Sequence, residues 1–178
     1  FWARGRGEVI EEREARDTMV ITRATTERLA RFAFRLAERR AARLGRAQTV
    51  TLVDKANVFT SMAFMRKVFR EVAAEFPGVP SGEHYVDAMA LDLVRRPWDF
   101  DVLPMENMFG DILSDLGAGL IGGMGYAPSA DIGDTGAEPL EFAVNGERDR
   151  RIKALVARAA KKHGLKPGKI DALEICCG

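Results

Sequence analysis

The alternation of hydrophobic and polar positions along the chain predicts helices that alternate with short apolar strands. A helix is predicted over residues 24–45, because apolar positions recur there at helical spacing and Gly45 provides a stop. Thr25 or Thr26 would cap its N-terminus. The predicted apolar face consists of Leu29, Phe32, Ala33 and Leu36.

Shorter elements follow at regular intervals. The β-branched run at residues 49–53 predicts a buried strand, and residues 60–76 repeat apolar side chains at helical spacing. The other expected elements are strands at 83–88 and 99–105, a helix at 88–96 ended by Pro97, and a helix from about Phe109. Strands separated by helices need crossover connections, which favour parallel pairing. The predicted fold class is therefore α/β, a sheet with crossover helices.

Beyond about residue 134 the sequence changes in character. Residues 147–168 predict a strongly amphipathic helix with Gly164 as its C-terminal stop. Two interpretations stay open for this helix: it closes the same domain as a surface helix, or it docks a partner. The expected organisation is an α/β domain over residues 1–134 and a tail over residues 135–178.

Composition and charge narrow the class of protein. The 178 residues are 47% hydrophobic and 30% charged, with a formal net charge of +1, as expected of an ordinary soluble globular protein. No apolar run approaches the ~20 residues of a membrane span, and the near-neutral charge argues against a nucleic-acid partner. The adjacent Cys176 and Cys177, with no secretory leader pattern, favour reduced thiols and a cytoplasmic location.

Two carboxylates four residues apart form the first candidate site. Asp111 and Asp115 would project from one face of the fourth predicted helix, where like charges repel. A hard cation such as Mg²⁺ or Mn²⁺ would offset that repulsion through carboxylate oxygens. The alternative is that Asp111 complements the positive end of the helix while Asp115 is simply solvated.

Asp87 and Lys55 stand where predicted strands end. Asp87 is either the N-cap of a helix or a further carboxylate that points at a ligand. Lys55 follows the strand at 49–53, and the carboxyl edge of a parallel sheet is where such folds build their clefts. A partly desolvated lysine can exchange protons there, although most loop lysines are only solvated. The glycine-rich residues 117–125 favour close packing of two helices over phosphate binding.

Three motifs, taken in order, resemble those of one enzyme family. The stretches VDKANV, YVDAMA and ENMFGDILSDLGAGLIGGMGYAPSADIG closely resemble the central motifs of the β-decarboxylating dehydrogenases. That family includes isopropylmalate, isocitrate, homoisocitrate, tartrate and D-malate dehydrogenases, and the similarity covers roughly residues 17–134. The resemblance implies oxidation of a 2-hydroxy acid with NAD⁺ or NADP⁺, then loss of CO₂, with Mg²⁺ or Mn²⁺ as the metal. It also implies the smaller, dimerisation domain of that fold.

The same resemblance assigns roles to individual residues. Lys55 matches the catalytic lysine, which passes a proton to and from the substrate hydroxyl. Asp111 and Asp115 match metal ligands, and Asp87 matches a metal ligand that reaches into the neighbouring subunit's site. Asn57 matches a position near substrate and nicotinamide. A homodimer is therefore expected, with the glycine-rich helix at its interface.

The chain also departs from the family pattern. In the family, the arginines that bind substrate carboxylates lie upstream of the matched motifs, and Phe1 falls where the general-acid tyrosine is expected. After SADIG, the sequence DTGAEPLEFAVNGERDRR replaces the expected adenosine-binding loop. Two functions therefore stay open: a partial β-decarboxylating dehydrogenase, or a non-catalytic homodimeric interface module that binds a partner.

Overall fold

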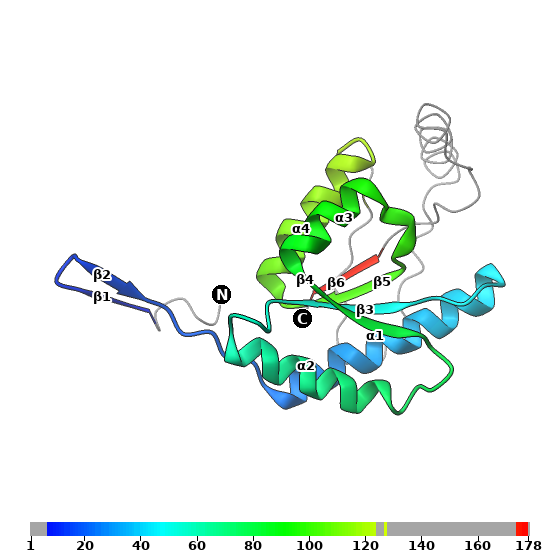
Figure 1. Cartoon of the computed structure of the whole chain (residues 1–178), viewed down its shortest axis with the longest axis horizontal. Helices are drawn as coiled ribbons and strands as arrows, with labels where there is room; N and C mark the ends of the chain where they lie inside the picture. Colours follow the sequence, from blue (N-terminus) through cyan, green and yellow to red (C-terminus); the bar gives the residue numbers. More distant parts are fainter. Residues whose placement is uncertain (1–6, 124–126, 128–173, 178) are drawn as a thin grey trace.

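The computed structural model describes residues 7–123, residue 127 and residues 174–177 of the chain (Figure 1). These residues contain a sheet with helices on both faces. The amphipathic helix predicted at residues 147–168 lies outside the described residues, so it stays a prediction. None of the described helices is long and apolar enough to cross a membrane.

Four strands form the sheet in the order β4, β3, β5, β6, and each neighbouring pair runs parallel. The strands are β3 (Val50–Asp54), β4 (Ser81–Tyr85), β5 (Val102–Met105) and β6 (Glu174–Cys177). The predicted α/β class with crossover helices is thereby confirmed. The sequence pattern does not predict β6, which contains Cys176 and Cys177 and pairs with β5.

Helices cover both faces of this sheet (Figure 1). One face carries α1 (Arg23–Leu44) and α2 (Thr60–Ala73), and the other carries α3 (Val86–Arg95) and α4 (Asn107–Leu120). A turn of 3₁₀ helix, η1 (Pro97–Asp99), links α3 to β5. Successive residues of β3 serve the two cores: Leu52 packs with α1 and α2, whereas Val53 packs with α3 and α4.

Helix α1 begins earlier than the sequence predicts. Its N-cap is Thr22, whose hydroxyl accepts a hydrogen bond from the Thr25 backbone N–H at 3.3 Å. Thr25 and Thr26 therefore lie inside the first turn, and the prediction that one of them is the cap is wrong. The error arises because several threonines compete for one role. The predicted stop is confirmed, since Gly45 has the left-handed φ of 66° that a helix end favours.

The inward face of α1 centres on Phe34 rather than on Phe32. Phe34 is fully buried, and its ring stacks on those of Phe69 and Phe76 with centroid distances of 5.5 and 5.0 Å. Ala33 is buried as predicted, whereas Phe32 is only partly buried. The apolar spacing identifies the helix, but the partner rings decide which phenylalanine turns inward.

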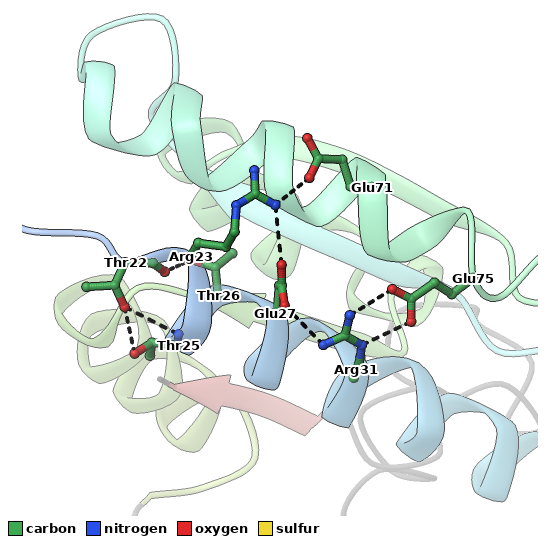
Figure 2. Close-up of polar contacts among 8 residues, drawn as sticks. All are labelled: Thr22, Arg23, Thr25, Thr26, Glu27, Arg31, Glu71 and Glu75. Atoms are coloured by element: carbon green, nitrogen blue, oxygen red, sulfur yellow. Dashed lines mark hydrogen bonds and ion pairs between the residues drawn. The ribbon is translucent and has the colours of Figure 1, made fainter.

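Ion pairs join α1 to α2 on the outer surface of the domain (Figure 2). Arg23 pairs with Glu27 and, at 2.5 Å, with Glu71. Arg31 also pairs with Glu27 and holds Glu75 through hydrogen bonds of 3.0 and 2.8 Å. Exposed ion pairs of this kind contribute little to stability, because solvent screens the charges and ordering the side chains costs entropy. The buried aromatic stack therefore stabilises the α1–α2 contact more than these charges do.

One buried carboxylate ties together the amino ends of β3 and β5. Asp101 is 7% exposed and accepts hydrogen bonds from the Thr49 backbone N–H at 2.9 Å and the Thr49 hydroxyl at 3.1 Å. Arg46 donates to the other carboxylate oxygen at 3.0 Å. Both oxygens are thus bonded, as buried charge requires. The contact aligns the starts of the two central strands.

A two-stranded antiparallel hairpin, β1 (Glu8–Ile10) and β2 (Glu14–Arg16), projects from the body of the domain (Figure 1). Glu11 and Glu12 at its turn have φ values of 50° and 53°, the left-handed conformation of a type I′ turn. Glutamate rarely occupies such positions, and the strands are only 3 residues long. The hydrophobic pattern therefore gives no sign of this hairpin.

On the face of the sheet that carries α3 and α4, Asp92 of α3 joins three segments. One of its carboxylate oxygens accepts from Arg96 at 2.8 Å and lies 2.9 Å from His84 Nε2 on β4. The His84 ring in turn stacks on Phe100, with a centroid distance of 5.9 Å. Arg96 and, to a lesser extent, His84 hold the pKa of Asp92 well below its ordinary value of 3.8.

We predict that Asp92→Asn lowers the free energy of unfolding at neutral pH. The unfolded chain binds a proton at Asp92 at higher pH than the folded chain does, so this contribution is complete above the ordinary pKa and lost as the pH falls below it. Denaturation curves between about pH 3 and 7 should show a gap between wild type and variant that is constant above about pH 5. The gap narrows as the pH falls below the ordinary pKa and closes only at the lower pKa of the folded chain. Asp99→Asn removes an exposed partner of Arg96 and should resemble the wild type. A pH-independent gap would contradict the assignment.

Candidate functional site

The candidate site lies at the carboxyl edge of the sheet. Lys55 directly follows β3. Asp87 is the second residue of α3, and α3 directly follows β4. The ends of these strands are side by side, since Asp54 pairs in register with Tyr85. Helix α4 starts two residues after β5, whose last residue pairs with Val53. Ligand sites of open α/β sheets occur at such an edge.

The backbone around Lys55 is fixed by several hydrogen bonds. The Lys55 carbonyl accepts from the N–H groups of Val58 and Phe59 at 2.9 and 3.0 Å. Its own N–H donates to the Met62 sulfur at 3.2 Å, and the Ala56 N–H donates to the Asp54 side chain at 2.9 Å. The last contact closes a turn around Lys55 of the kind that aspartate side chains favour. The lysine therefore leaves the strand in one defined direction.

The structure brings Lys55 and Asp87 together. The Lys55 ammonium lies 2.5 Å from a carboxylate oxygen of Asp87, and their side chains are 23% and 67% exposed. Lys55, helped by backbone N–H groups at the start of α3, lowers the pKa of Asp87. Because Tyr85 is the N-cap of α3, the interpretation of Asp87 as an N-cap is wrong. The expected strand at 83–88 instead ends at Tyr85, and the helix begins at once.

Asp111 and Asp115 lie on α4, four residues apart and exposed, as the sequence predicts. Only Asn107 approaches the Asp111 carboxylate among the described residues, at 3.5 Å. Helix α4 begins at Asn107, earlier than the predicted Phe109, and has no acidic residue in its first turn. The alternative in which Asp111 complements the helix end is therefore not supported, because that effect fades within the first turn.

The donor chemistry of this pair fits a hard divalent cation. Two exposed carboxylates without an ion-pair partner among residues 7–123 supply the oxygen ligands that Mg²⁺ or Mn²⁺ prefers. However, within the part of one chain that the structure describes, no three acidic, histidine or cysteine side chains lie close enough to hold a metal together. Asp87 thus does not complete a site with Asp111 and Asp115 of the same chain.

Asn57 and the glycine-rich segment complete the predicted set. Asn57 is exposed two residues after Lys55, at the same edge of the sheet. In the glycine-rich segment, α4 continues to Leu120, which is 46% exposed. A Cβ added at Gly119 would meet no atom within 4 Å among the described residues. Within the described part of this chain, the close helix packing predicted for residues 117–125 is therefore not seen at Gly119.

Two residues near Lys55, Asp54 and Arg66, are not predicted from the sequence. Asp54, whose side chain is 0% exposed, forms a bidentate pair with Arg66 of α2 at 2.8 and 2.6 Å. The only signal in the sequence is an aspartate at the end of an apolar run, TLVD, directly before Lys55. A buried carboxylate there demands a cation, but nothing in the spacing shows which one.

Comparison with known proteins now defines the class of this chain. Residues 3–146 match the family model described as isocitrate/isopropylmalate dehydrogenase. The match extends beyond the motifs of residues 17–134 at both ends. The chain therefore belongs to the isocitrate/isopropylmalate dehydrogenase family, a family of decarboxylating dehydrogenases.

Individual relatives agree with this membership. The chain is 48% identical over 127 residues to 3-isopropylmalate dehydrogenase of Archaeoglobus fulgidus, covering 70% of this chain and 37% of the relative. It is 41% identical over 124 residues to a probable tartrate dehydrogenase/decarboxylase of Bacillus subtilis, covering 69% and 33%. Its fold resembles the apo β-decarboxylating dehydrogenase of Thermococcus kodakarensis, with a TM-score of 0.64 and 35% identity over 90% of this chain and 48% of that one. The chain thus spans about a third of the length of these curated relatives.

Proposed function

We propose that the chain carries the lysine and metal-ligand residues of an NAD⁺- or NADP⁺-linked dehydrogenase that oxidises a 2-hydroxy acid and releases CO₂. The proposed substrate belongs to the malate, tartrate, isocitrate and isopropylmalate class. The observation that carries this proposal is the contact of Lys55 with Asp87 at the carboxyl edge of the sheet. Family membership supplies the reaction class. A cytoplasmic location and the role of a smaller, dimerisation domain over residues 1–134 belong to the same proposal.

Each site residue has a definite task in this proposal. Lys55 exchanges a proton with the substrate hydroxyl, and Asp87 holds its ammonium in place. Asp111 and Asp115 would bind Mg²⁺ or Mn²⁺, with Asp87 contributed to the neighbouring subunit's metal. Such a cation would supply Lewis-acid stabilisation of negative charge on a substrate oxygen, which both oxidation and decarboxylation of a 2-hydroxy acid require. Asn57, exposed beside Lys55, would contact the substrate and the nicotinamide.

A homodimer would complete this site. Because the three aspartates do not meet within the described part of one chain, a second copy is needed to bring Lys55 and Asp87 to its partner's Asp111 and Asp115. Helices α3 and α4 offer a surface for it, since their outer faces expose large apolar side chains. These are Leu91 at 55%, Val94 at 57%, Met108 at 49%, Ile112 at 59% and Leu120 at 46%.

The same apolar surface favours a second candidate, a non-catalytic homodimeric interface module derived from such an enzyme, which would bind a partner. Both candidates need the dimer, but only the first needs Lys55 to react. Turnover therefore separates them.

We predict that the purified chain, given Mn²⁺ and NAD⁺ or NADP⁺, oxidises at least one of malate, tartrate, isocitrate and 3-isopropylmalate. Reduced cofactor is followed by its absorbance. Lys55→Met should abolish this signal while Mn²⁺ affinity is retained, because the lysine moves the proton and does not bind the metal. Absence of turnover across the panel by a folded dimer would favour the non-catalytic module.

We predict that Asp111→Ala weakens Mn²⁺ binding by at least about 10-fold. Loss of a group that only supports a metal ligand already weakens affinity by about that much, so loss of a ligand should weaken it at least as far. Calorimetric titration of the chain with MnCl₂ measures this affinity. Glu38→Ala removes another exposed helix carboxylate, from α1, and is the matched control. Equal affinity in the wild type and Asp111→Ala would reduce Asp111 to an ordinary surface charge.

We predict that Leu91→Glu shifts the protein from dimer to monomer in sedimentation velocity, since it places a charge within the exposed apolar surface of α3 and α4. Val20→Glu changes an exposed apolar residue outside these helices and should leave the dimer intact. A wild-type monomer at all concentrations would contradict the shared site.

A further inference from the structure

We propose that Arg66 is a positioning residue for Lys55, acting through the Asp54 carboxylate and the Tyr85 ring. This inference rests on the proposed role of Lys55 and identifies the residue that would hold Lys55 in position. Arg66 lies on α2, on the opposite face of the sheet from α3, which carries Asp87. Its guanidinium nonetheless reaches the end of β3, where the lysine begins.

The first contact fixes the backbone of Lys55. Arg66 Nε donates to Asp54 Oδ2 at 2.8 Å, and Arg66 Nη2 donates to Asp54 Oδ1 at 2.6 Å. Asp54 Oδ1 also accepts from the Ala56 N–H at 2.9 Å, so the oxygen that binds the arginine also closes the turn over Lys55. A carboxylate buried to this extent is stable only with such a partner. Removing the guanidinium would release both the charge and the turn.

The second contact fixes the side chain of Lys55. Arg66 Cζ lies 5.0 Å from the centroid of the Tyr85 ring, and Lys55 Nζ lies 5.7 Å from the same centroid. Two cations near one ring would repel each other, but Asp54 neutralises Arg66, and Glu83 lies 3.6 Å from it. The lysine ammonium thus contacts both the Tyr85 ring and the Asp87 carboxylate. Asp54 raises the pKa of Arg66, so its charge is permanent.

Arginine is required for this arrangement because one group must bind a carboxylate with two parallel hydrogen bonds and lie against a ring. A lysine at position 66 would keep the charge and lose both features. Arg70, one turn further along α2, provides a contrast. It forms an equally bidentate pair with Glu83, at 2.5 and 2.7 Å, but its side chain is 64% exposed. Replacing Arg70 therefore changes the same kind of pair on the same helix while the guanidinium that binds Asp54 stays in place; Glu83 is the one group that the two arginines share.

The test measures how accessible the Lys55 amine is in the chain without substrate or cofactor. Acetic anhydride is added at fixed pH, and modification of Lys55 is followed by peptide mass spectrometry. Lys67, exposed on the same helix as Arg66, is the internal reference. In Arg66→Lys, the rate at Lys55 relative to Lys67 should rise about 3-fold, the range expected when a cation–ring contact of moderate strength is lost. Arg70→Lys should leave the ratio at the wild-type value.

A second pair of variants keeps the inference testable if Arg66→Lys loses its helical circular dichroism. Tyr85→Leu removes the ring and should raise the Lys55 ratio, whereas Tyr85→Phe keeps the ring and should restore the wild-type ratio. A role confined to general stability would lower the midpoint of thermal unfolding and leave the Lys55 ratio at the wild-type value. An unchanged Lys55 ratio in folded Arg66→Lys, or in Tyr85→Leu, would overturn the inference.

Turnover provides the link to the proposed function. In Arg66→Lys, kcat should fall by about 10- to 100-fold while KM changes little, because a displaced catalytic group affects the reacting state more than substrate binding. If the wild type shows no turnover, the proposed function fails, and the acetylation ratios still decide the role of Arg66. If turnover is present but Arg66→Lys and Arg70→Lys behave alike in both assays, only the positioning role fails.

Discussion

The charge buried at the end of the central strand is the constraint on which this domain depends. An ionised carboxylate inside an apolar layer is unstable unless a cation and hydrogen bonds satisfy it. In this chain Arg66 provides both for Asp54. That pairing holds α2 to the end of β3 and determines where Lys55 emerges. One interaction therefore supports both the packing of α2 against β3 and the geometry at Lys55.

The sequence predicts this fold where its signals are periodic, and fails where they are not. The helix at α1 and the strand at β3 follow from apolar spacing, and Lys55 is found because strand ends form sites in such sheets. The Asp54–Arg66 pair leaves no repeating pattern, since its members lie on different elements. The N-cap alternative for Asp87 is wrong because β4 ends and α3 begins without a linker, which makes Tyr85 the cap.

The candidate acidic groups lie in two separate places, so the described part of one chain does not assemble a metal site. Lys55 and Asp87 meet across the ends of β3 and β4, whereas Asp111 and Asp115 lie along α4. Sequence spacing predicts that Asp111 and Asp115 share one face of a helix, whereas the Lys55–Asp87 contact joins residues from two different elements that spacing does not relate. In the proposed function a second copy of the chain joins the two pairs, and no spacing within one chain encodes such an assembly. The family match covers residues 3–146 of this chain. The chain spans about a third of the length of its curated relatives.

The two edges of the sheet have separate supports. At the amino edge, Asp101 bonds Thr49 and Arg46 and keeps the central strands aligned without using any group from the opposite edge. Strand alignment therefore has its own anchor, remote from the loops that would meet a small molecule. During evolution, those loops can exchange residues and adopt new chemical preferences while the scaffold beneath them keeps its shape.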